Sequence, residues 1–239
     1  MTKLPPVENK LWWLFLIWSA IGLIAIVTQT EADTIQRLVS QPQLRFFFMS
    51  CLAWGDFIFH VFAAVNLLFA VSSWLGWRRT WISFAVIAIL SSVVETLGAT
   101  TGFPFGSYFY TERMGPMLGN TLPLAIPLAW WNILGSFFML TRYAFPRLNS
   151  RLTCLIVAGL ATALDWVMEP FAWKIRGYWI WESAQIPLQN YVSWFVLSFI
   201  LCRISPLHSP YRPELDKRAL AIPALMLAFF VSARLLHGI

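Results

Sequence analysis

Four acidic residues lie within long apolar runs of this sequence, where charged side chains are rare. They are Asp56, Glu95, Asp165 and Glu169. An ionisable side chain at the depth of a lipid bilayer costs at least about 2.5–3.5 kcal/mol on insertion scales, so its presence there indicates a functional site. Buried carboxyl groups offer acid–base catalysis or a proton relay.

Two of these acidic residues, Asp165 and Glu169, are four positions apart, so both carboxyls lie on one face of a predicted helix. Two close carboxyls in a medium of low dielectric cannot both ionise cheaply, and we expect one to keep its proton at neutral pH. That proton would make the pair a Brønsted acid. The structural alternative is that Glu169 lies at the membrane surface and pairs with Lys174 or Arg176.

The composition of the 239-residue chain explains why these residues stand out. Apolar residues make up 59% and charged residues only 12%, whereas an ordinary globular domain has about 25% charged residues. We therefore expect an all-α fold, a polytopic membrane helix bundle with a single transmembrane domain over residues 1–239. Apolar runs predict about seven transmembrane helices, at residues 11–28, 46–73, 81–98, 122–141, 152–170, 188–204 and 219–236.

The basic residues predict the orientation of these helices. The chain has 17 Lys and Arg residues and a net charge of +6, and most of them fall on the same side of the membrane as the N-terminus. By the positive-inside rule, we expect a multi-pass protein of the cell membrane with a cytoplasmic N-terminus. Membrane lipids, and no nucleic acid, are then the expected partners of this charge.

The predicted topology brings the acidic residues to one level of the membrane. Glu95, Asp165 and Glu169 lie near the outer ends of their helices, and Asp56 lies about ten residues, or ~15 Å, below the same outer face. The structural alternative for Asp56 is a pair with His60. The outer half of the membrane is thus expected to hold Asp56, Glu95, Asp165 and Glu169 together with the amides Asn132 and Asn190.

Two loops on this outer side are rich in Gly, Pro and aromatic residues. They span residues 98–110 and 177–191 and contain Tyr108, Trp179 and Trp181. We expect them to fold back as a lid of aromatic faces over the acidic layer. Anchoring of the aromatic rings at the lipid headgroups is the alternative.

The inventory of residues excludes several reaction classes. The chain has three widely spaced histidines, no lysine in the middle of a predicted helix, and no Asp-rich motif for binding diphosphates. A Walker loop, a G-x-S-x-G motif and a dinucleotide fingerprint are also missing from the sequence. We therefore expect acid chemistry on an apolar substrate, with no metal and no cofactor.

Several short motifs spread over about residues 50–205 occur together. They are Glu95-x-x-Gly98, Thr101-Gly102-x-Pro104-Phe105-Gly106-x-Tyr108-x-Tyr110, Asp165-x-x-x-Glu169-Pro170 followed by Gly177-x-Trp179-x-Trp181, and Pro187-x-x-Asn190 before Trp194. This combination resembles the integral-membrane carotenoid biosynthesis family, whose characterised members are CruF-type carotenoid hydratases, including the bisanhydrobacterioruberin hydratases. The chain departs from the family pattern at Glu169, where the family usually has Asp before the proline.

The resemblance implies hydration of a terminal isoprenoid double bond in a carotenoid or another long isoprenoid. Protonation gives a tertiary carbocation, which water captures as an alcohol. We expect Asp165 to donate the proton, with Glu169 and Glu95 tuning it or holding water. The expected substrate-binding residues are Asp56, Tyr108, Asn132, Trp179, Trp181 and Asn190, with the aromatic faces stabilising the cation and the two amides positioning water.

Two other functions remain open at this point. A carotene cyclase begins with the same protonation, but a neighbouring double bond then captures the cation. A small proton-coupled transporter also uses buried carboxyls, although a transporter would need ionisable groups in both halves of the membrane.

Overall fold

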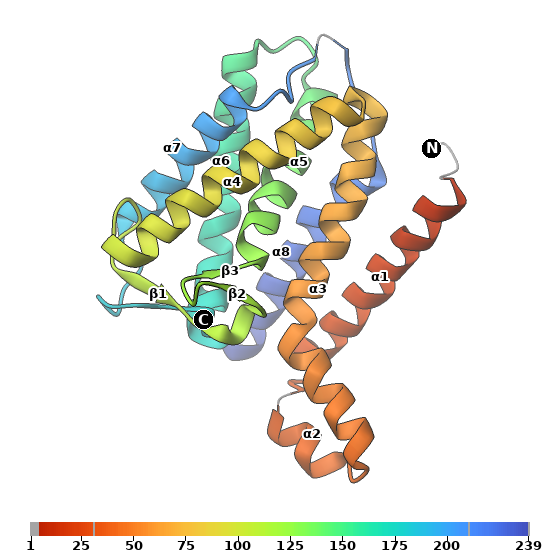
Figure 1. The fold of residues 1–239 in the computed structure, drawn as a ribbon, viewed down its shortest axis with the longest axis vertical. Coiled ribbons are helices and arrows are strands. Elements are labelled where there is room, and N and C mark those ends of the chain that lie inside the picture. The colour runs from red at the N-terminus through yellow and green to blue at the C-terminus, as the bar shows by residue number, and fades with distance from the viewer. Residues whose placement is uncertain (1–4, 31, 210, 239) are drawn as a thin grey trace.

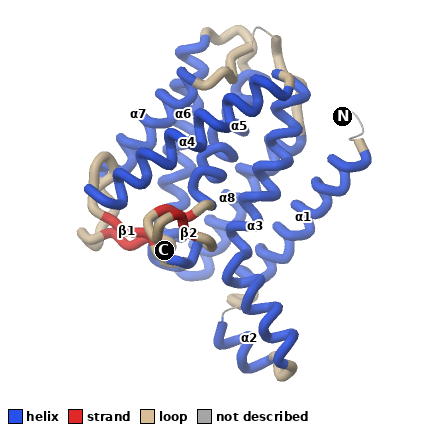
Figure 2. Tube along the Cα trace, in the orientation of Figure 1, coloured by secondary structure: helices blue, strands red, loops and turns tan. Residues whose placement is uncertain are grey.

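Helices make up most of the chain, and the strands are short. The computed structural model describes residues 5–30, 32–209 and 211–238. Figures 1 and 2 show long helices packed side by side, with short strands gathered toward one end of the bundle. The long helices are α1 (Pro6–Val27), α3 (Pro42–Leu75), α4 (Trp77–Thr101), α5 (Ala125–Ala144), α6 (Ser150–Pro170), α7 (Leu188–Ile204) and α8 (Lys217–His237).

All seven ranges predicted from the sequence are confirmed as helices, with ends that differ by a few residues. Within the described residues, five segments are long and apolar enough to cross a membrane: α1, α3, α4, α8 and the continuous helical segment Ser150–Ile175. The apolar helix α7 is shorter, with 17 residues. Helices suit this environment because they satisfy their own backbone hydrogen bonds in lipid. The chain is a polytopic all-α membrane protein.

Helix α5 forms the centre of the bundle. Fourteen of its 20 residues are buried, and it packs against α3, α4, α6 and α8. The large aromatic side chains of α5, such as Trp130 and Trp131, therefore pack against other helices and face little lipid.

Helix α1 lies at the edge of the bundle, where it packs on α3 and α8 (Figure 1). Its buried residues are Trp12, Phe15 and Ser19. An ion pair also ties it to the start of α8, because the buried Arg218 contacts Glu8 at 2.6 Å. The same guanidinium contacts Asp216 at 2.7 Å.

Helix α6 does not stop at Pro170 but continues as one π-helical turn, Phe171–Ile175. Proline lacks a backbone N–H and so cannot continue the regular hydrogen-bond ladder of an α-helix. In the wider turn that follows, the N–H of Arg176 donates to the carbonyl of Phe171 at 2.9 Å. Such π turns are frequent at functional sites.

The two predicted aromatic loops pair with each other through short strands. Strand β1 (Tyr108–Tyr110) is antiparallel to β4 (Trp179–Trp181), with Tyr108 opposite Trp181 and Tyr110 opposite Trp179. We call this two-stranded pair the aromatic ribbon. The other short elements are helix α2 (Ala32–Leu38), a 3-10 turn (Glu112–Met114) and the antiparallel strands β2 (Met117–Leu118) and β3 (Leu122–Pro123).

Candidate active site

Glu95 lies near the C-terminal end of α4 and accepts three side-chain hydrogen bonds. The hydroxyls of Tyr108 and Tyr110 donate to its Oε2 at 2.8 and 2.7 Å, and the indole Nε1 of Trp130 donates to its Oε1 at 2.7 Å. The residue is 5% exposed. Three donors thus satisfy the acceptor oxygens of this buried carboxyl.

Gly98 allows the chain after α4 to come this close to Glu95. A Cβ atom at position 98 would lie 2.6 Å from Cδ2 of Phe105 and 3.0 Å from the hydroxyl oxygen of Tyr108. Any side chain at position 98 would therefore push Tyr108 away from the carboxyl. The spacing Glu95-x-x-Gly98 thus has a direct steric cause.

Asp165 and Glu169 lie one turn apart on α6 and are both buried. The amide Nδ2 of Asn190, on α7, donates to Oδ2 of Asp165 at 2.9 Å and to Oε1 of Glu169 at 3.1 Å. Glu169 also accepts from the indoles of Trp179 and Trp181 at 3.2 and 3.1 Å. Glu169 therefore has three donors, whereas Asp165 has one, and Oδ1 of Asp165 has no partner.

The aromatic ribbon covers the carboxyls and supplies most of their donors. Alternate residues of a strand point to the same face, so Tyr108 and Tyr110 of β1 lie on one face together with Trp179 and Trp181 of β4. Their polar ring atoms bond to Glu95 and Glu169, as described above. The expectation that the two loops form a lid over the acidic layer is confirmed, with the polar edges of the rings making the contact.

The tyrosines of the ribbon are held as hydrogen-bond donors. Burial, and then the neighbouring Glu95 carboxylate, raise the pKa of Tyr108 and the pKa of Tyr110 well above the ordinary value of 10.0. Both hydroxyls therefore keep their protons through the physiological pH range and remain donors to Glu95.

A cavity of about 290 Å³ reaches all three of these carboxyls. Glu95, Asp165 and Glu169 contribute to its wall, as does Asn190. Aromatic rings supply much of the remaining wall near the carboxyls, including Tyr108, Tyr110, Trp130, Trp179, Trp181 and Trp194. The cavity wall thus combines one carboxyl with an unpartnered oxygen, Asp165, two carboxyls that each accept three hydrogen bonds, Glu95 and Glu169, and the faces of aromatic rings.

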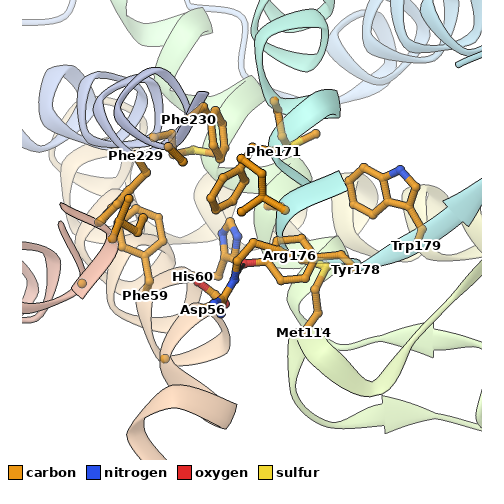
Figure 3. Close-up of a pocket in the computed structure, with 18 of the residues that line it drawn as sticks. Asp56, Phe59, His60, Met114, Phe171, Arg176, Tyr178, Trp179, Phe229 and Phe230 are labelled. Atoms are coloured by element: carbon orange, nitrogen blue, oxygen red, sulfur yellow. Dashed lines mark hydrogen bonds and ion pairs between the residues drawn. The ribbon is translucent and has the colours of Figure 1, made fainter. Parts of the chain in front are cut away.

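Asp56 lines the same cavity from α3 but belongs to a different group of polar residues. Its Oδ2 forms an ion pair with Arg176 at 2.6 Å (Figure 3). The pKa of Arg176 is raised by the neighbouring Tyr178 oxygen and the Asp56 carboxylate. This contact replaces the alternative that paired Asp56 with His60. The alternative that paired Glu169 with Lys174 or Arg176 is also replaced, because the partners of Glu169 are the two indoles and Asn190.

Asn132 bonds to the residue one turn after Asp56. Its Nδ2 donates to the backbone carbonyl of His60 at 3.1 Å and lies 3.4 Å from the ring Nδ1 of His60. His60 lines the cavity, whereas Asn132 is not among the residues of its wall. Asn132 is therefore set apart from the carboxyls that it was expected to serve.

Sequence comparison assigns the chain to a family. The model of the carotenoid biosynthesis protein family matches residues 55–239. The chain belongs to this family. The match includes every carboxyl and every ribbon residue of the candidate site, and it confirms the resemblance drawn from the motifs.

A curated relative of this carotenoid biosynthesis protein is the bisanhydrobacterioruberin hydratase of Haloarcula japonica. The two are 29% identical over 194 residues, which cover 79% of this chain and 61% of that protein. The chain thus matches about three fifths of the relative's length. No solved structure matches the chain.

Of the expected site residues in this carotenoid biosynthesis protein, most come together. Two hydrogen-bonded groups lie on the wall of one cavity: Glu95 with Tyr108, and Asp165 and Glu169 with Trp179, Trp181 and Asn190. Asp56 lines the same cavity in a separate ion pair, and Asn132 lies outside it. Among the aromatic cavity residues near the carboxyls, Tyr110, Trp130 and Trp194 were missing from the expected set. The alternation Tyr108-x-Tyr110 is a sequence signal for the first of these, because it places both rings on one face of a strand.

The contact between Trp130 and Trp194 needed the structure to reveal it. Their rings stack with centroids 4.1 Å apart and planes inclined by 14°. Trp130 bonds to Glu95 from α5, and Trp194 extends the aromatic wall from α7. The two stacked rings come from residues 64 positions apart, so the local spacing of the sequence carries no information about their contact.

Proposed function

We propose that this protein adds water to a terminal isoprenoid double bond of a carotene. Membership of the carotenoid biosynthesis family, and similarity to a protein named as a hydratase, support a carotenoid substrate and a hydration. The observation that carries the proposal is that Oδ1 of Asp165 has no hydrogen-bond partner. Asp165 lines the cavity, and the other carboxyls in the cavity wall have hydrogen-bond or ion-pair partners.

In the proposed first step, the Asp165 carboxyl gives its proton to the less substituted carbon of the terminal double bond. The π electrons form the new C–H bond, and the other carbon becomes a tertiary cation. An alkene is a weak base, so the donor must be a preorganised acid in an apolar site. Asp165 suits this role because it is fully buried and has a single donor, from Asn190.

The cation then lies among aromatic faces. Tyr108, Trp179, Trp181 and Trp194 line the cavity, and the face of an aromatic ring attracts a nearby cation by about 0.5–2 kcal/mol. These rings are also held in place, because three of them are in the aromatic ribbon.

In the proposed second step, water attacks the cation and forms the C–O bond. One proton of the attacking water passes to a carboxylate. Within the pair Asp165 and Glu169, this proton returns to Asp165 and regenerates its acid form. Glu169 and Glu95 are the proposed positions for holding this water, since each is held as an acceptor by three donors. Net, one water is added, and no oxidant, reductant or cofactor is consumed.

The proposal is tested by expressing the chain in a bacterium that accumulates an acyclic carotene and measuring the masses of the extracted pigments. A pigment heavier by one water supports hydration. An isomer of unchanged mass would overturn it in favour of cyclisation, and an unchanged pigment in cells that contain the folded protein would also contradict it. The matched control is Asp165→Asn, which should leave the pigment unchanged.

A further inference from the structure

The cavity that reaches the carboxyls continues to the other side of the bundle. Its wall includes Trp18, Gly22 and Ala25 of α1, Cys51 and Gly55 of α3, and Met226, Phe229 and Ala233 of α8. We call the part of the cavity between these three helices the α1–α3–α8 arm. It is one continuous space with the carboxyl site.

The walls where the arm meets the carboxyl site are mainly aromatic. Phe59 and Phe229 lie edge to face with centroids 5.4 Å apart, and Phe171 lies 5.3 Å from Phe230. Figure 3 shows Phe59, Phe229 and Phe230 on the side of the cavity away from Trp179. Flat aromatic walls suit a flat conjugated hydrocarbon chain, which stacks on them and needs no hydrogen bonds.

The cavity is too small to hold the whole of a long substrate. Pockets for drug-sized ligands have roughly 300–1,000 Å³, and this cavity has about 290 Å³. It can therefore hold the end group of a long isoprenoid and the first part of its chain. The rest must extend outward.

The arm also reaches the surface of the bundle that faces lipid. Two of its lining residues, Ile21 of α1 and Phe48 of α3, are 53% and 44% exposed. A hydrocarbon chain that passes between α1 and α3 would thus meet lipid. Helix α1 is the least buried of the candidate spans.

We propose that the α1–α3–α8 arm binds the polyene chain of the substrate, whose end group lies at the carboxyls. This inference rests on the proposed function for the chemistry at the end group. Helix α1 lies outside the residues that the family model matches, 55–239. The arm would therefore set which chain length this particular protein accepts.

The test fills the arm without touching the carboxyls. Ala25→Trp on α1 and Cys51→Trp on α3 each place a large ring at a lining position. The matched controls are Ala20→Trp and Ala53→Trp, on exposed positions of the same two helices that are not among the lining residues. Each variant is purified in detergent and given two substrates with the same terminal group: a long acyclic carotene and a short acyclic terpene.

We expect Ala25→Trp and Cys51→Trp to raise KM for the long carotene at least tenfold and to leave hydration of the short terpene within about twofold. The control variants should behave as the wild type with both substrates. Equal effects of the arm variants on both substrates, or no effect on either, would overturn the proposal.

A binding measurement separates this inference from the proposed reaction. Retention of the long carotene by purified protein is read from its visible absorption after gel filtration. If the wild type retains the carotene but forms no alcohol, the proposed function fails. If the arm variants retain the carotene as well as the wild type does, the arm is not its binding site.

Discussion

The side-chain amide of Asn190 donates to Oδ2 of Asp165 at 2.9 Å, and Oδ1 of the same carboxyl has no hydrogen-bond partner. Both residues are buried, on α7 and α6, and these helices pack closely together. The amide fixes the orientation of the carboxyl and leaves its other oxygen free to carry a proton. The proposed mechanism depends on this relationship more than on any other contact.

Asp165→Asn should abolish most of the turnover while the protein still folds and binds carotene. The amide has the same shape but has no acidic proton to give to a double bond. General acid catalysis contributes a factor of about 10²–10⁴, so kcat should fall by that amount. The measurement is the initial rate of alcohol formation by purified protein, with carotene retention as the control for folding.

Glu169→Gln is the matched comparison and should cost less than Asp165→Asn, since a neutral amide can still hold water. The assignment of the donor is wrong if Asp165→Asn keeps near-normal turnover and Glu169→Gln or Glu95→Gln abolishes it. If all three variants keep their activity, this group of carboxyls is not the acid.

Removing single donors from the aromatic ribbon should lower turnover without removing it. Tyr110→Phe takes one hydrogen bond from Glu95, and Trp181→Phe takes one from Glu169. A hydrogen bond to a charged group contributes about 1.5–3 kcal/mol, which corresponds to a loss of roughly ten- to a hundredfold in kcat when the bond stabilises the transition state and not the ground state.

The control for the ribbon variants is Phe109→Ala, at a half-exposed position between the two tyrosines. It leaves all the donors in place, so its kcat should stay within about threefold of the wild type. A loss in Phe109→Ala as large as that in Tyr110→Phe would show that the ribbon acts through its stability alone.

The helices were predictable from the sequence, because lipid imposes a single requirement on every span. Long apolar runs such as residues 46–73 and 188–204 can satisfy their backbone groups only as helices. The shared face of Asp165 and Glu169 followed from the same periodicity. The burial of α5 did not follow, because its apolar run looks like that of a lipid-facing helix.

The partners of the charged residues could not be predicted, because they come from distant parts of the chain. Asp56 pairs with Arg176, which is 120 positions away, rather than with the nearby His60. The register that sets Tyr108 opposite Trp181 also depends on tertiary contacts. The sequence identified the loops that form the ribbon and predicted that their rings stabilise a cation. The structure adds that the same rings donate hydrogen bonds to Glu95 and Glu169.

Turnover should need no added metal, nucleotide or oxygen. The sequence has only three histidines and no phosphate-binding loop, and the proposed reaction consumes only water. Purified protein should keep its full rate in anaerobic buffer with a chelator. Strict dependence on iron or on a nicotinamide cofactor, shown by recovery of the rate when it is added back, would contradict this prediction.

The N-terminus should lie in the cytoplasm and the C-terminus outside. In the structure, basic residues from the end of α5 and from the segment before α8 meet at one end of the bundle: Arg142 donates to the carbonyl of Ser209 at 3.2 Å, and Arg212 donates to that of Tyr143 at 2.9 Å. The positive-inside rule assigns this end to the cytoplasm. A reporter enzyme that works only outside the cytoplasm should be active when fused to the C-terminus and inactive at the N-terminus; the reverse pattern would invert the proposed orientation.

Isotope incorporation during turnover tests hydration most directly. Purified protein is incubated with an acyclic carotene in buffer made with heavy-oxygen water, and the mass of the product is measured. Capture of a carbocation by solvent water predicts a product that is heavier by one water and carries the heavy oxygen isotope. A product of unchanged mass, or a hydroxylated product with oxygen of ordinary mass, would contradict hydration by this protein.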